Sequence, residues 1–206
     1  NTPLWKLPSV DFDGTRPLDW MNLTFEWDTS YVNYWREDGI GGHRMDLRPA
    51  ISAPIPLSPY LESRAELGVR DTFYFVSEYG DAEWDEEDTQ NRLLADFETE
   101  VATSLARDYG LGGGTSGFNH LLRPFVRYNY TPDVDQDELP SFDSVDRIEE
   151  TNAITYGIDN FFNLFDNSSG VQKTTREAAY LRIQQAYDLR SESSDEPFSE
   201  IFTELR

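Results

Sequence analysis

Polar and apolar residues alternate along most of this chain, in stretches separated by turns and loops. The clearest stretch runs from Arg44 to Leu57. Its odd positions are Met45, Leu47, Pro49, Ile51, Ala53, Ile55 and Leu57, and its even positions are Asp46, Arg48, Ala50, Ser52, Pro54 and Pro56. Because neighbouring side chains of a strand point to opposite faces, this pattern predicts a strand with an apolar medium on one side and water on the other.

The same alternation recurs and predicts about nine long strands. They are expected at about residues 4–12, 20–36, 44–57, 61–79, 92–109, 120–130, 154–165, 176–189 and 198–206. Tight turns are expected near residues 13, 58, 114 and 168, and the other connections near residues 40, 85, 141 and 194. Short turns at one end and long loops at the other are typical of outer-membrane barrels. We therefore predict an all-β, antiparallel up-and-down meander that forms a partial wall of a large outer-membrane β-barrel.

Aromatic residues gather near both ends of the expected strands. Near the longer connections are Tyr31, Tyr34, Trp35, Phe73, Tyr74, Phe75, Tyr79, Tyr128, Tyr130 and Tyr187. Near the tight turns are Trp20, Tyr60, Tyr109, Phe162 and Phe165. Two aromatic girdles at membrane interfaces have this distribution, although aromatic residues also settle near strand ends in soluble sandwiches.

Composition narrows the choice of protein class. The 206 residues have a low mean hydropathy of −0.63, which does not exclude a barrel, because alternation hides the lipid-facing side chains in the average. No apolar run is long enough for a transmembrane helix, and the first residues lack the features of a signal peptide. The absence of cysteine excludes disulfides and thiolate metal sites. The net charge of −22 argues against direct nucleic-acid binding.

Much of the acidic charge lies in three segments, residues 80–90, 133–146 and 191–196, which are expected to be solvated loops. Divalent-cation binding is the alternative. Asp133, Asp135 and Asp137 have the spacing that opens a calcium loop. However, Glu138 occupies the position that requires glycine, and Ser144 the position of the final glutamate. The sequence therefore predicts neither a metal site nor a cofactor.

Catalysis has little support in the sequence. His43 and His120 are the only histidines, and neither has a recognisable serine or aspartate partner nearby in the chain. The motifs of α/β-hydrolases, zinc proteases and P-loop proteins are absent. We therefore expect that the protein is not an enzyme.

Particular residues go beyond the alternating pattern. They are the run Leu122 to Pro132, Asp135-Gln136, Phe142-Asp143-Ser144, Asp146-Arg147-Ile148, Asn152, Thr155 and Gly157, with Tyr31 to Arg36, Arg44 to Pro49 and Arg70 to Tyr74 upstream. In these residues the chain closely resembles the barrel domain of the LptD family, the lipopolysaccharide (LPS) assembly or organic solvent tolerance proteins. The resemblance spans nearly the whole chain, in strand and loop residues instead of a catalytic signature.

The resemblance implies a large barrel that moves LPS to the outer leaflet of the bacterial outer membrane. Residues 1–206 are then expected to form one partial transmembrane barrel domain, without the periplasmic jellyroll domain or the closing strands. The implied partners are LPS, an LptE-like plug lipoprotein, outer-membrane lipid, and the periplasmic Lpt bridge, reached through the missing jellyroll. The chain itself is expected to be a non-catalytic wall of the conduit.

Side chains in phase with the polar face of the strands are the candidates for contact with LPS. They are Arg64, Glu66, Arg70, Asp96, Glu98, Arg123, Arg127, Asp159 and Arg182. Arginines there could pair with phosphates, and salt bridges within the wall are the alternative for each of them. Two other functions remain open from the residues alone: a secreted soluble β-sandwich that binds divalent cations through its acidic loops, and a small complete outer-membrane barrel.

Overall fold

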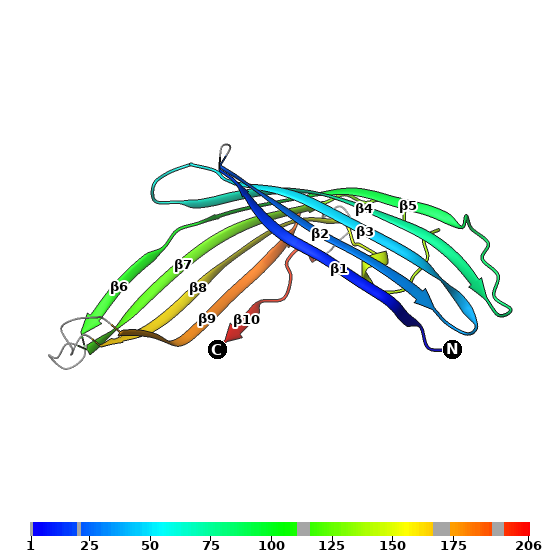
Figure 1. The fold of residues 1–206 in the computed structure, drawn as a ribbon. Helices are drawn as coiled ribbons and strands as arrows, with labels where there is room; N and C mark the ends of the chain where they lie inside the picture. The colour runs from blue at the N-terminus through cyan, green and yellow to red at the C-terminus, as the bar shows by residue number, and fades with distance from the viewer. Residues whose placement is uncertain (1, 20–21, 111–115, 167–173, 191–195) are drawn as a thin grey trace. The chain divides into compact units, whose positions relative to one another are not determined.

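A computed structural model describes residues 2–19, 22–110, 116–166, 174–190 and 196–206. The strands in these ranges are β1 (Trp5–Leu18), β2 (Leu23–Trp35), β3 (Gly39–Pro54), β4 (Glu62–Tyr79), β5 (Thr89–Ala102), β6 (Leu105–Gly110), β7 (Ser116–Thr131), β8 (Thr151–Asp166), β9 (Thr174–Asp188) and β10 (Phe202–Leu205). A single 3-10 turn in the described ranges, η1 (Ser144–Asp146), lies between β7 and β8. The ten strands belong to one sheet, which confirms the all-β prediction (Figure 1).

The strands follow one another through the sheet as a meander. Their order is β1-β2-β3-β4-β5-β7-β8-β9-β10, and β6 also pairs with β7. The β1–β2, β2–β3, β6–β7, β8–β9 and β9–β10 ladders are antiparallel. In the described residues this path ends at β1 and β10, so the sheet is open. A single open sheet fits a partial barrel wall and fits neither a two-layered sandwich nor a small closed barrel.

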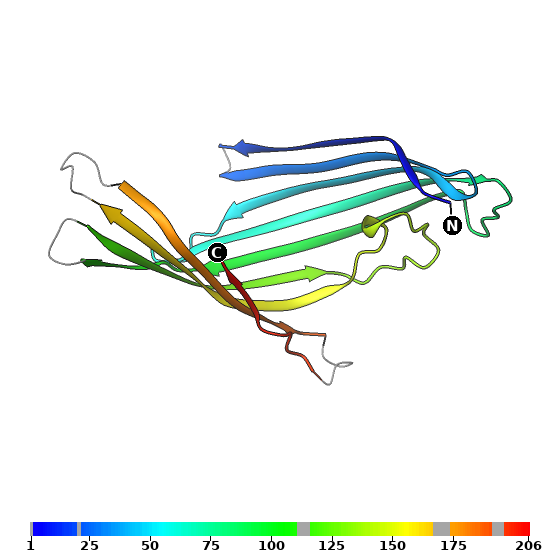
Figure 2. The same ribbon diagram turned by 90° about the horizontal axis from the view of Figure 1, so that it is seen from below.

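The chain divides into two compact units. Unit 1 comprises residues 1–53, 65–98 and 130–151, with β1 to β3, most of β4 and β5, and the loop between β7 and β8. Unit 2 comprises residues 54–64, 99–129 and 152–206, with β6, most of β7, and β8 to β10. Figure 2 shows the strands of unit 1 side by side, with η1 in front of one face.

The expected turn at Asp13–Gly14 is wrong, because β1 continues through these residues to Leu18. Gly14 pairs with Trp27 of β2. A Cβ atom at Gly14 would lie 2.3 Å from a carbon of the Trp27 ring, so only glycine leaves room for that ring. The glycine therefore admits an aromatic side chain across the ladder and does not mark a turn.

The strand expected at residues 92–109 is divided into β5 and β6, which explains ten strands where nine were expected. The break faces Pro124 of β7, which has no N–H group to donate to the ladder. The Thr103 backbone N–H donates to the Pro124 carbonyl at 3.2 Å. The neighbouring Ser104 hydroxyl donates to the Glu62 carboxylate at 2.6 Å. The break between β5 and β6 thus lies opposite a proline that cannot donate to the ladder. The polar groups of Thr103 and Ser104 at the break bond to Pro124 and Glu62 instead.

The two ends of the strands differ in their connections. At one end, the short-turn end, strands are joined by residues 19–22, 55–61, 111–115 and 167–173. At the other end they are joined by residues 36–38, 80–88, 132–150 and 189–201. The connection expected near residue 40 is shorter than predicted, because β3 already begins at Gly39, whose φ of +123° suits glycine. The turns expected near 114 and 168 and the loop near 194 fall on residues outside the described ranges.

Candidate functional site

The two faces of the sheet have the reverse of the side-chain distribution of a water-soluble sheet: apolar side chains are exposed and polar side chains are buried. One face, the apolar face, exposes Met45, Ile51, Leu67, Val69, Phe75, Leu93, Val126, Ile158 and Ile183. The opposite face, the polar face, buries Arg44, Asp46, Ser52, Thr72, Arg92 and Asp159. Arg44 is 2% exposed, whereas its neighbour Met45 is 41% exposed. A water-soluble sheet would bury the apolar residues instead, so the predicted alternation of the two faces is confirmed.

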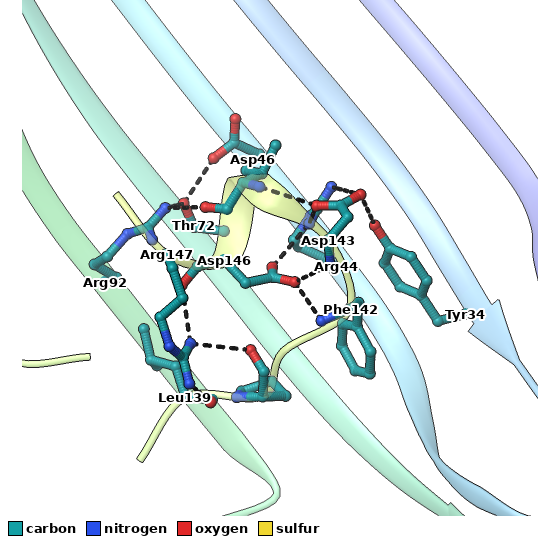
Figure 3. A network of polar contacts seen from close by, with 12 residues as sticks. Tyr34, Arg44, Asp46, Thr72, Arg92, Leu139, Phe142, Asp143, Asp146 and Arg147 are labelled. Atoms are coloured by element: carbon teal, nitrogen blue, oxygen red, sulfur yellow. Dashed lines mark hydrogen bonds and ion pairs between the residues drawn. The ribbon is translucent and has the colours of Figure 1, made fainter. Parts of the chain in front are cut away.

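In unit 1 the loop of residues 132–150 lies on the polar face and is bound by Arg44 of β3 (Figure 3). Arg44 Nη1 donates to Asp146 Oδ1 at 2.8 Å and also to Asp143, and Nη2 donates to Asp143 Oδ2 at 3.2 Å. Asp143 Oδ2 accepts further hydrogen bonds from Tyr34 Oη at 2.6 Å and from Lys6 Nζ at 2.7 Å. Strands β1, β2 and β3 thus converge on one loop carboxylate.

The same two aspartates also shape the loop. Asp143 caps η1 by accepting from the Val145 N–H at 3.0 Å. Asp146 accepts from the N–H groups of Phe142 at 2.6 Å and Asp143 at 2.7 Å, which completes a capping box. The Phe142 ring stacks on Tyr34 with centroids 4.4 Å apart. Loop conformation and loop docking therefore depend on the same carboxylates.

Arg92 of β5 provides a second attachment for the loop. Its Nη2 donates to the Val145 carbonyl at 2.9 Å, and its Nη1 donates to Gln136 Oε1 at 2.8 Å. The Gln136 side chain in turn bonds both backbone groups of Ile148, accepting from N–H at 3.0 Å and donating to the carbonyl at 2.9 Å. The start and the end of the loop are therefore joined at the same place where the loop meets the sheet.

Asp46 continues this network along the sheet. It accepts from Arg70 Nη2 at 2.8 Å and from the Thr72 hydroxyl at 2.6 Å. The Thr72 oxygen accepts from Arg92 Nη2 at 3.0 Å (Figure 3). Hydrogen bonds thus run from Arg70 through buried Asp46 and Thr72 to Arg92, which binds the loop. Buried networks of this kind stabilise one arrangement, because breaking one of their hydrogen bonds leaves a buried polar group unpaired, which is costly.

The loop carboxylate Asp143 is held in its charged form. Partial burial acts to raise its pKa, but the hydrogen bonds from Arg44, Lys6 and Tyr34 outweigh burial and lower the pKa below the ordinary value of 3.8. The anchor is therefore ionised at any pH near neutrality.

In unit 2 the polar face carries a network of the same chemistry that is more exposed to solvent. Glu100 accepts from Arg123 Nη2 at 2.7 Å and from Arg127 Nη2 at 2.6 Å. Asp159 accepts from Arg182 Nε at 2.6 Å. The arginine side chains are 23%, 32% and 29% exposed for Arg123, Arg127 and Arg182, against 3% for Arg44. These arginines therefore remain within reach of solutes.

The nine residues predicted to face the lumen enter ion pairs of the wall or lie in phase with them. Those in ion pairs are Glu66 and Asp96 with Arg48, Arg70 with Asp46, Arg123 and Arg127 with Glu100, and Arg182 with Asp159. Arg64 and Glu98 lie on β4 and β5 in phase with these residues. The salt-bridge alternative thus describes at least seven of the nine. Contact with LPS stays a prediction.

The sequence did not single out the residues that bind the loop. Arg44, Asp143 and Asp146 occur within the runs that carry the family resemblance, but their spacing in the chain gives no sign that they meet. Tyr34 and Tyr74, expected in an aromatic girdle, are 0% exposed and lie on the polar face, so this part of the prediction is wrong. One signal was available, because both tyrosines are out of phase with the exposed apolar positions of their strands.

The histidines form single hydrogen-bond contacts, and the described acidic side chains form no cluster that could bind a metal ion. His43 Nδ1 lies 2.8 Å from Tyr31 Oη, and His120 Nε2 lies 3.2 Å from Asn160 Oδ1. In the described part of the chain, no group of three or more histidine, cysteine or acidic side chains could hold a metal ion. Within those same residues, no helix is long and apolar enough to cross a membrane. Most of the acidic segment at 191–196 lies outside the described residues.

A family model described as LptD, LPS transport system D, matches residues 1–204. The chain belongs to the LptD family. Among its relatives, the LPS-assembly protein LptD of Methylococcus capsulatus is 24% identical over 84% of this chain and 18% of that protein. Its counterpart in Nitrosospira multiformis is 26% identical over 83% of this chain and 20% of that protein. The LptD of Pseudomonas aeruginosa strain UCBPP-PA14 is 25% identical over 82% of this chain and 24% of that protein.

Membership in the LptD family confirms the resemblance drawn from the sequence. The chain spans about a fifth of the length of the curated relatives that it matches. The matched region includes both the loop of unit 1 and the arginine pairs of unit 2.

Proposed function

We propose that this chain forms part of the wall of an outer-membrane β-barrel through which LPS reaches the outer leaflet. The observation that carries this proposal is the inverted sheet, with exposed Met45, Ile51 and Phe75 on one face and buried Arg44 and Asp46 on the other. Such a sheet is stable where lipid covers the apolar face and a hydrated interior meets the polar face. Membership in a family described by LPS transport supports the choice of cargo.

The proposed conduit works by contact, without chemistry on the cargo. The phosphorylated head group of LPS passes along the polar face, while its acyl chains leave sideways into the membrane. The proposed contacts are Arg64, Glu66, Arg70, Asp96, Glu98, Arg123, Arg127, Asp159 and Arg182. The partly exposed arginines of unit 2 are the strongest of these, because a guanidinium can exchange a carboxylate for a phosphate with the same paired geometry.

The rest of the machinery lies outside residues 1–206 in this proposal. An LptE-like lipoprotein fills the barrel, a periplasmic jellyroll domain connects it to the Lpt bridge, and further strands close the wall. An open sheet has unpaired edges, which a membrane does not tolerate, so the described strands need those additional strands to insert.

Photo-crosslinking in cells tests the proposal on the full-length protein. A benzophenone amino acid is placed at Glu98 or Arg123 on the polar face, and at Leu105 or Leu122 on the apolar face as matched controls. Glu98 and Leu105 are exposed, so neither substitution disturbs a buried contact. We expect LPS adducts at Glu98 and Arg123 and membrane phospholipid adducts at Leu105 and Leu122. LPS adducts at neither polar position, or equally at all four, would refute the proposal.

A further inference from the structure

The apolar face of unit 2 changes character toward the short-turn end. The paired residues on this face of β6 and β7 are Leu105 and Leu122, then Arg107 and His120, then Tyr109 and Phe118. On β8 and β9 they are Ile158 and Ile183, Asn160 and Leu181, Phe162 and Ala179 and, after a register shift, Leu164 and Arg176. Both ladders thus begin as aliphatic surface and acquire an outward-facing arginine close to the connection at 111–115 or 167–173.

Aromatic rings accompany these arginines. Tyr109 stacks on Phe118 with centroids 4.6 Å apart, and the Arg107 guanidinium lies 5.1 Å from the Tyr109 ring centre. His120 stacks on Phe162 at 4.6 Å. Aromatic rings beside a cation, next to an aliphatic band, are typical of the depth at which a barrel meets lipid head groups.

The two outward arginines differ from those of the polar face in their partners. Arg107 and Arg176 are exposed, and neither forms an ion pair with any residue that the structure describes. Asp166, a carboxylate near this end of β8, accepts a hydrogen bond from Ser116 at 3.1 Å. In a chain of net charge −22, these two cations lie on a largely apolar surface and are available to an anion from outside the described residues.

We propose that Arg107 and Arg176 bind the head-group phosphates of anionic glycerophospholipids, such as phosphatidylglycerol, in the leaflet that surrounds the short-turn end. This inference rests on the proposed membrane location. Short turns of outer-membrane barrels face the periplasm, so the lipid at this depth is glycerophospholipid and not LPS. The guanidinium groups reach the phosphate while their aliphatic stems and the rings of Tyr109 and Phe162 lie against the glycerol and upper acyl region.

The test uses the full-length protein in vesicles of equal amounts of phosphatidylglycerol and phosphatidylcholine. A benzophenone amino acid at Leu105, one pair away from Arg107, captures neighbouring lipid, and mass spectrometry gives the ratio of the two adducts. We expect phosphatidylglycerol to be enriched about fivefold over phosphatidylcholine, the effect of one arginine near a membrane surface. Arg107→Gln should return the ratio to that of the membrane, and Arg107→Lys should retain most of the enrichment. A probe at Leu164 with Arg176→Gln repeats the measurement on β9.

Two controls define the outcome. Arg190→Gln removes an exposed arginine that pairs with Asp188, and it should leave the ratio at Leu105 unchanged. A probe at Ile183, within the aliphatic band, should capture both lipids equally in every variant. Equal capture of the two lipids at Leu105 in the unaltered protein, or enrichment that survives Arg107→Gln, overturns this inference alone. The absence of any lipid adduct at both Leu105 and Ile183 overturns the membrane location as well.

Discussion

Ion pairs of the same kind have arginines of very different burial in the loop-binding network of unit 1 and on the polar face of unit 2. In unit 1 the side chains of Arg44 and Asp146 are 3% and 0% exposed, because the loop covers Arg44 and its own backbone N–H groups surround Asp146. In unit 2 Glu62 is 55% exposed and Arg127 is 32% exposed. Burial decides what an ion pair does: a buried pair is costly to break and fixes a structure, whereas an exposed pair contributes little and is easily exchanged.

For the proposed conduit this difference assigns separate tasks to the two units. The network under the loop of unit 1 holds residues 132–150 on the polar face and engages the guanidinium groups of Arg44 and Arg92 with atoms of the loop. The open network of unit 2 keeps arginines such as Arg123 and Arg182 beside water, where an anionic head group can compete for them. Predictions that separate the two networks therefore test the comparison directly.

The largest effect is expected from Arg44→Met in the full-length protein. The substitution leaves Asp146 buried without its cation and removes two bonds to Asp143, so loop docking should weaken by about 3–5 kcal/mol. Proteolysis within residues 132–150, followed over time in the folded membrane protein, measures this. The matched change in unit 2, Arg127→Met, should cost about 1 kcal/mol or less and leave the loop protected. Equal protease sensitivity in the two variants would contradict the comparison.

A smaller effect is expected from Thr72→Val, which keeps the shape of a fully buried side chain and removes its hydroxyl. Asp46 then loses a donor and Arg92 loses an acceptor, at a cost of about 1–3 kcal/mol. Thr72→Ser retains the hydroxyl and should recover most of the stability. The midpoint of thermal unfolding in detergent gives the order of the three proteins. A Thr72→Val protein as stable as the unaltered one would show that the hydroxyl is not part of the network.

Arg44 and its neighbours also show how much of the site could be predicted from the sequence. The phase of Met45 and Arg44 in one strand was enough to predict two opposite faces, because a strand has a fixed period. Gly14 was misread as a turn, since its role depends on the Trp27 ring of the next strand. The docking of Asp143 on Arg44 joins residues 99 positions apart, and only the folded chain brings them together. The period of a strand can be predicted from the sequence, whereas the position at which a loop docks on the sheet cannot.

Salt should separate the networks by a still smaller amount. The Arg123–Glu62 pair is open to screening by salt, because Glu62 is largely exposed. Its coupling energy of at most about 1 kcal/mol should therefore decrease when the salt concentration is raised from about 0.05 M to about 0.5 M. The coupling of Arg44 to Asp146 should change little, because water and ions are excluded from it. Double-mutant cycles at both salt concentrations measure the two couplings. A matching loss of coupling in both pairs would mean that the loop does not seal unit 1.

The smallest effect near neutrality is expected from pH, and its direction follows from Asp143. Its pKa in the folded protein lies below the ordinary value of 3.8, so the charged form is favoured by docking. The stabilisation is therefore fully present above that ordinary pKa and is lost as the pH falls through the lower pKa of the docked loop.

Protease protection of residues 132–150 should stay constant from pH 8 to about pH 4 and decline only in stronger acid. Asp143→Asn should give weaker protection at every pH, with a flatter profile in acid. A decline already between pH 7 and 5 would mean that a different group controls the docking of the loop.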